Sequence, residues 1–179
     1  MLTTSQLATL RADIIADGTL NAQPNNSDGN SVIAAAYNLN AVPDFWVWRT
    51  SVPKSEMTNS VSVDATTFSW TGTGFITRSV GERDAWRELF GEGGVCNPSL
   101  ANVRQAFSDI FSGATAPAPA NRTHLTTVAR RKATRGEKLF ATGTGSTASP
   151  GLLNVVAAGA IGFSEGQLTY SDVGQARSN

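Results

Sequence analysis

The chain has 179 residues, of which 40% are hydrophobic and only 16% are charged, and this length favours one domain with extended appendages. Its 14 basic and 14 acidic side chains cancel, which argues against a general nucleic-acid coat, because such a coat needs an excess of positive charge. Cys96 is the only cysteine and His124 the only histidine. Neither an internal disulfide nor a cysteine metal cluster can therefore form.

The N-terminus and the apolar runs predict a soluble intracellular protein with no membrane partner. The opening residues 1–5 lack the charged and apolar regions of a secretory signal. The longest apolar run, Val155–Ile161, is far shorter than the roughly 20 residues that span a bilayer.

The N-terminal third predicts two helices separated by a turn. Residues 4–16 place apolar side chains at helical spacing, with Thr3, Thr4 or Ser5 as the N-cap. Residues 24–30 are rich in turn formers. A short helix over residues 29–39 is then expected to bury Val32, Ile33, Ala36 and Tyr37.

An aromatic segment follows between two prolines. Phe45, Trp46 and Trp48 lie within four residues, a density that indicates a core anchor. The alternative is an exposed docking patch, in which Trp46, Trp48 and the adjacent Arg49 are interface anchors. Residues 58–78 predict a short hairpin or a loop, with a turn at 72–74.

The middle of the chain predicts two further helices. Residues 79–91 begin with a capping box formed by Ser79 and Glu82. Residues 98–112 follow Asn97 as a cap, with Pro98 in the first turn. Their expected apolar stripes are Trp86, Leu89 and Phe90 on the first helix, and Leu100, Val103, Phe107, Ile110 and Phe111 on the second.

The C-terminal part begins with a linker over residues 114–120. A fifth helix is expected over 121–142, and the rest of the chain, 143–179, is expected to be extended, with a strand near Leu168–Tyr170. The predicted fold class is therefore mainly α. A helical bundle domain (1–142) carries an aromatic loop or short hairpin, and an extended C-terminal arm (143–179) follows it.

Charge is segregated along the chain. Four acids lie on the predicted helix 79–91 or just after it, namely Glu82, Asp84, Glu88 and Glu92. Five basic residues lie on the fifth helix, namely Arg130, Arg131, Lys132, Arg135 and Lys138. These sets are either two solvated helix faces with no clear internal bridge, or complementary surfaces of neighbouring copies. The basic set lacks the Asn or Gln side chains that read bases, so only non-specific contact with DNA phosphates is expected.

No catalytic or cofactor motif stands out. The glycine-rich residues 143–145 follow a helix, whereas a dinucleotide loop follows a strand and opens a helix. His124 has no second histidine, and the single Cys96 is too little to complete a zinc site with it. We expect His124 at the surface or at a helix start. We expect no metal, cofactor or enzymatic role.

Several runs resemble a family of structural proteins of tailed bacteriophages and prophages. These runs are Leu2–Asp13, Pro24–Gly29, Phe45–Val52, Phe107–Gly113 and Ala133–Gly145. Together they span most of the chain in the right order, from residue 2 to residue 145. Such proteins are similar in size and helical content to head–tail adaptors, in which helical bundles pack side by side in a ring, often a dodecamer, beneath the portal.

The resemblance implies a virion protein at the portal vertex or neck, present in the host cytoplasm during assembly. Its partners would be copies of itself, the phage portal protein, and tail or nozzle proteins, with residues 143–179 reaching the portal. The alternatives are a capsid cement or minor head protein, a DNA-binding accessory protein, and a small hydrolase or lysis factor. Besides the charged residues above, the candidate contact residues are Trp46, Trp48, Arg49, Leu168 and Tyr170.

Overall fold

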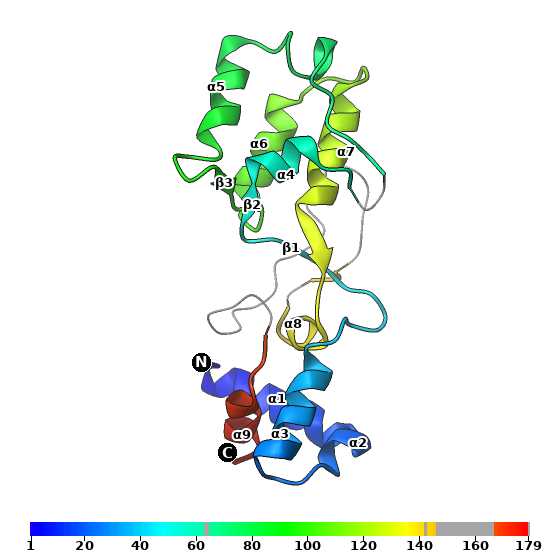
Figure 1. Ribbon diagram of the computed structural model, residues 1–179, viewed down its shortest axis with the longest axis vertical. Helices are drawn as coiled ribbons and strands as arrows, with labels where there is room; N and C mark the ends of the chain where they lie inside the picture. Colours follow the sequence, from blue (N-terminus) through cyan, green and yellow to red (C-terminus); the bar gives the residue numbers. More distant parts are fainter. Residues whose placement is uncertain (63–64, 142, 146–166, 179) are drawn as a thin grey trace. The chain divides into compact units, whose positions relative to one another are not determined.

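The computed structural model describes residues 1–62, 65–141, 143–145 and 167–178 (Figure 1). These residues are mainly helical, as the sequence predicts. They divide into two compact units that do not follow the predicted boundary at residue 142. The first unit contains the described residues of 1–45, 132–145 and the C-terminal stretch from 167, and the second contains those of 46–131.

The first unit begins with three helices. Helix α1 (Thr4–Ala16) is confirmed, and Thr3 is its N-cap in a full capping box with Gln6. Asp17 ends α1, and its side chain caps the short α2 (Gly18–Asn21). Helix α3 (Ser27–Tyr37) begins inside the predicted turn, because the Asn26 side chain accepts the backbone N–H of Gly29.

The core of the first unit lies between α1, α3 and the C-terminal helix. Leu10, Ile14, Ile33 and Tyr37 are buried there, whereas Val32 is exposed, contrary to expectation. Helix α8 (Arg135–Phe140) also contacts α1 and α3. A Cβ at Gly136 would lie 2.9 Å from the Cδ1 of Leu168, so a larger residue there requires the Leu168 side chain to move.

The prediction of an extended C-terminal arm is wrong for its last residues. Residues Tyr170–Ser178 form α9, which packs against α1 and α3. The expected strand at 168–170 does not form, because Thr169 caps this helix through reciprocal hydrogen bonds with Asp172. Leu168 is buried, and its backbone N–H and C=O both bond to the Asn38 side chain, at 2.8 and 2.9 Å. Residues 146–166 of the predicted arm lie outside the described residues.

The second unit combines helices with short strands. In chain order its elements are β1 (Trp46–Trp48), β2 (Val52–Pro53), α4 (Lys54–Asn59), the 3-10 turn η1 (Gly72–Gly74), α5 (Val80–Glu88), β3 (Val95–Cys96), α6 (Ala101–Ile110) and α7 (Ala118–Val128). Strand β2 pairs antiparallel with β3, with Val52 opposite Cys96. Strand β1 pairs with β4 (Arg130–Lys132).

Aromatic rings fill the core of the second unit. Trp86 of α5 stacks on Phe68 at 5.7 Å between ring centroids and meets Phe90 and Phe111 edge-on at 4.8 and 5.4 Å. Trp48 lies in the same core with only 2% of its surface exposed. Because Trp48 and Phe45 are buried and Trp46 packs against the core, the aromatic segment is largely a core anchor.

The two predicted middle helices are present with shifted ends. Ser79 and Glu82 form the predicted capping box of α5. Helix α6 begins at Ala101 rather than at Pro98, because the Asn97 side chain instead binds the backbone and hydroxyl of Ser99 in a turn. Leu100 precedes that helix and is exposed, contrary to its expected place in the stripe. Between residues 58 and 78 the described part has no hairpin, only the isolated bridge of Val61 with Thr67.

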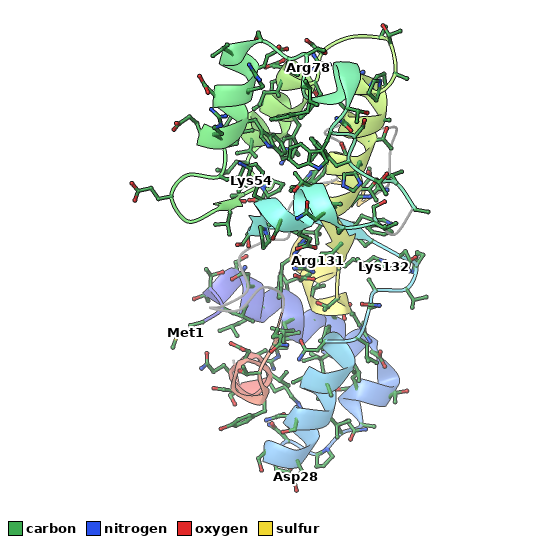
Figure 2. The ribbon with its side chains drawn as sticks, turned by 45° about the horizontal axis from the view of Figure 1, so that its top comes forward. Met1, Asp28, Lys54, Arg78, Arg131 and Lys132 are labelled. Carbon is green, nitrogen blue, oxygen red and sulfur yellow. The ribbon has the colours of Figure 1, made fainter. Side chains whose placement is uncertain are left out.

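The predicted helix 121–142 is wrong and is the largest correction to the fold. Helix α7 starts earlier, at Ala118, and ends at Val128. The backbone then turns into β4, where it pairs with β1, and the guanidinium of Arg130 lies 5.1 Å from the ring centre of Trp46. A new capping box of Thr134 and Glu137 starts α8. The basic residues therefore do not share one helical face, as the strand origin of the labelled Arg131 and Lys132 shows in Figure 2.

We expect Trp86→Ala to lower the free energy of unfolding by about 3–5 kcal/mol, because it empties a core site with 1% exposure. Trp70→Ala is the matched control, since Trp70 touches the same cluster but is 41% exposed. Chemical denaturation monitored by circular dichroism measures both. Equal losses in the two variants would contradict this assignment of the core.

Candidate functional site

An ionic cluster in the first unit joins three helices. Arg135, the first residue of α8, donates from one terminal nitrogen to Asp13 at 2.8 Å and from the other to Asp17 at 2.9 Å. Asp13 is in α1 and Asp17 follows it, four residues later, so both carboxylates face the same way. The guanidinium also lies 4.6 Å from the ring centre of Tyr37 on α3, in cation–π contact.

The cluster perturbs the pKa values of Asp17, Tyr37 and Arg135. The hydrogen bond from Arg135 lowers the pKa of Asp17 below its ordinary 3.8. Burial, reinforced by a hydrogen bond to Asp13, raises the pKa of Tyr37 far above its usual range. Burial opposes the charge of Arg135, but its bonds to the two carboxylates outweigh that effect and raise its pKa. At neutral pH a guanidinium therefore faces two carboxylates, and Tyr37 stays neutral.

A groove of about 770 Å³ lies beside this cluster, within the first unit. The acids Asp13 and Asp17 line it together with the α8 residues Arg135, Lys138 and Leu139 and the residues of 36–42 that follow or end α3. Two apolar side chains at the groove are left in solvent, Leu39 with 67% and Val42 with 91% exposure. We call this feature the unit 1 groove.

Lys138 is the cation of the unit 1 groove with the weakest internal contacts. Its ammonium lies 3.5 and 3.4 Å from the carbonyl oxygens of Val42 and Pro43. No carboxylate of the described residues forms an ion pair with it, whereas Arg135 has two. The groove therefore offers exposed apolar surface together with one positive charge that an incoming carboxylate could meet.

A smaller hollow of about 250 Å³ lies in the second unit, around Arg78 and Glu82. Arg78, labelled in Figure 2, donates to the carbonyl oxygen of Ser112 at 2.8 Å and to Glu82 at 3.3 Å. The backbone N–H of Ser79 lowers the pKa of Glu82, with further help from Arg78. These contacts hold the start of α5 in place, and they account for the charges around the hollow without a ligand.

The structure gives most of the predicted basic residues internal contacts. Lys132 pairs with Asp44 at 2.8 Å, Arg130 lies over Trp46, and Arg135 belongs to the ionic cluster. Arg131 is half-buried on β4. Of the five predicted residues, only Arg135 and Lys138 line the unit 1 groove.

The predicted acidic residues also divide into two kinds. Glu82 belongs to the capping box, and Asp84 pairs with Arg87 at 2.8 Å, so the expectation of no internal bridge is wrong. Glu88 and Glu92 are exposed, and neither forms an ion pair within the described part of the chain. These two remain available to a partner.

Most of the other predicted contact residues serve the fold. Trp48 is buried in the core, Trp46 packs against it, and Arg49 pairs with Glu56 through both terminal nitrogens. Leu168 is buried against α8 and α3. Tyr170 is exposed at the start of α9 and stays a candidate contact.

His124 is fully buried, which corrects the expectation of a surface residue. Its Nε2 lies 2.9 Å from the carbonyl oxygen of Met57, and its Nδ1 lies 3.0 Å from the carbonyl oxygen and 3.2 Å from the hydroxyl of Thr66. A neutral ring that donates from Nε2 to Met57 accepts the Thr66 hydroxyl at Nδ1, but it has no proton there for the Thr66 carbonyl oxygen. Burial lowers the pKa of this histidine, against the effect of the carbonyl contacts. Its ring therefore braces α7 against the segment after α4.

Two further groups carry no reactive chemistry in this arrangement. Cys96 is buried, and burial raises the pKa of its thiol to about 12, which leaves almost no thiolate at neutral pH. Among the described residues, no group of three or more His, Cys, Asp or Glu side chains is placed to hold a metal ion.

Nor does any helix in the described part combine the length and apolar character needed to cross a membrane.

Sequence reasoning singled out Arg135 and Lys138 but missed the acidic and apolar residues of the unit 1 groove. Asp13 and Asp17 are four apart, and this spacing was a signal that a cation binds both. The exposure of Leu39 and Val42 could not be predicted, because the sequence does not distinguish an exposed apolar residue near a loop from a buried one.

Comparison of this chain with protein-family models, with curated proteins and with solved structures found no match.

We expect Arg135→Ala to destabilise the first unit by about 1–2 kcal/mol, because it leaves Asp13 and the buried Tyr37 without their cation. Arg11→Ala is the control, since Arg11 lies on the same helix as Asp13 and has no recorded partner within the described residues. Thermal unfolding compares the two variants. An Arg135 variant as stable as the Arg11 variant would show that the cluster contributes nothing.

The second unit should lose stability as the pH falls through 6.5, the ordinary pKa of histidine. The folded-state pKa of His124 lies below this value, so the unfolded chain binds the proton first and stability is complete only above it. Because His124 is the only histidine, its imidazole NMR signals report this titration directly. A native pKa at or above 6.5 would contradict the assignment of a neutral buried ring.

Proposed function

We propose that this chain is a non-enzymatic virion structural protein, a head–tail adaptor that forms a ring between portal and tail. The observation that carries the proposal is the unit 1 groove. It combines exposed Leu39 and Val42 with the ammonium of Lys138, which has no carboxylate partner in the described structure. Exposed apolar side chains rimmed by polar groups are typical of protein–protein contact sites.

The proposal treats the first unit as a small helical bundle. Helices α1, α3, α8 and α9 pack on one another and present the unit 1 groove at one side. Such a bundle supplies a rigid surface, and a rigid surface loses little entropy when a neighbour binds. In this proposal, exposed residues of the described C-terminal part contact the portal, and Tyr170 is the best candidate among them.

The arrangement of charges and reactive groups supports an assembly role over the other classes. A DNA-binding face needs several cations directed at phosphates, but Lys132 and Arg135 are held by carboxylates of this chain. A hydrolase needs an accessible base or nucleophile, but His124 and Cys96 are buried.

Localised reconstruction of the portal vertex in intact particles tests this function. We expect one ring of this chain beneath the portal and no copies elsewhere in the shell. Copies spread over the icosahedral shell would instead show a cement or minor head protein. Absence from the particle would overturn the structural role altogether.

A further inference from the structure

We infer that copies of this chain bind one another head to tail, with the unit 1 groove of one copy holding residues 88–95 of the next. We call these residues the acidic turn. The inference deepens the proposed function, on which its biological meaning rests, by naming the partner of the groove as a second copy.

The unit 1 groove leaves only a few groups for a partner. Arg135 is already held by Asp13 and Asp17, so these three charges are engaged with one another. Lys138 has only two long contacts with carbonyl oxygens, at 3.5 and 3.4 Å. The exposed side chains of Leu39 and Val42 lie along the same groove. The best occupant therefore carries a carboxylate next to an apolar side chain.

The acidic turn has this composition. Glu88 is the last residue of α5, Glu92 follows it, and both are exposed without an ion-pair partner among the described residues. Val95, at the start of β3, is also exposed. Figure 1 shows the connection between α5 and β3 as a protruding loop of the second unit.

The acidic turn is held in shape before any partner binds. Gly91 and Gly94 have φ angles of 51° and 64°, which favour glycine. The carbonyl oxygen of Gly94 accepts the N–H of Lys54 at 2.8 Å, and the N–H of Val95 donates to the carbonyl oxygen of Phe90 at 3.1 Å. A preformed loop avoids the entropy cost of ordering on binding.

The charges that the two surfaces leave unpaired are opposite in sign. Other charges on α5 include Asp84 and Arg87, which neutralise each other, and Arg83, which lies five residues before Glu88 and so on a different helical face. Two carboxylates thus remain to meet Lys138. Because the groove and the turn are different surfaces, each copy can use both at once, and repetition of such a contact closes into a ring or grows into a filament.

Charge exchange in the purified full-length chain tests the contact. We expect Lys138→Glu, or Glu88→Lys combined with Glu92→Lys, to weaken self-association at least about tenfold, because each replaces an attraction with a repulsion. A chain carrying all three changes should regain most of the wild-type association. Arg83→Glu is the control on the same helix and should leave association unweakened. Sedimentation equilibrium measures each constant, with circular dichroism confirming that every variant folds.

Site-directed crosslinking provides an independent test. Two differently tagged copies, one with Val42→Cys and the other with Glu92→Cys, should form a mixed disulfide under mild oxidation. Val80→Cys in place of Glu92→Cys is the control, since Val80 is exposed at the other end of α5. The native Cys96 is buried and stays unreactive.

Three outcomes overturn the inference: a wild-type chain that stays monomeric, charge variants that associate like the wild type, or equal crosslinking of the Val80 control. Failure here differs from failure of the proposed function. A ring at the portal vertex without charge-dependent association would refute this contact and leave the adaptor function standing. Charge-dependent association of a chain absent from particles would refute the adaptor function and leave the contact standing.

Discussion

The double ion pair of Arg135 with Asp13 and Asp17 is the interaction on which the first unit most depends. This unit is built from stretches of chain that lie on either side of 86 intervening residues, 46–131. Such a long closure costs chain entropy, which only contacts between the stretches can offset. Arg135 connects α8 to α1, and it lies over Tyr37 of α3. Helix α9 completes the unit through Arg177, which donates to Gln23, Pro24 and Asn30.

Local signals in the sequence were enough to predict the elements that depend on local physics. The predicted capping box of Ser79 and Glu82 begins α5, and Thr3, one of three expected caps, begins α1. The predicted helix 121–142 failed because its middle is held by a distant strand, β1, whose pairing no helical periodicity reveals. Helix α9 was missed because Val173 and Ala176 are its only buried side chains, too few to show an apolar stripe.

The charge pattern shows why a candidate site is harder to predict than a helix. The sequence displays five basic residues within nine positions, but it does not show that Asp44 lies beside Lys132 or that two acids of another helix hold Arg135. Likewise, the sequence does not show that His124 is buried. The structure shows it, because Met57 and Thr66 contact its two ring nitrogens. Only the charged side chains that have no ion-pair partner within the fold are left to bind a partner, and the sequence does not show which these are.

The chain leaves the first unit after Phe45 and returns to it at Lys132, and these two points are fastened together. The N–H of Ala133 donates to the carbonyl oxygen of Phe45 at 2.7 Å, and Lys132 pairs with Asp44 beside it. Joined ends of this kind are what let one domain be inserted into another without disturbing the host. Residues 46–131 thus have the architecture of a cassette. Recombination could exchange them for another module with closely spaced ends, while the surrounding helices keep every contact among themselves.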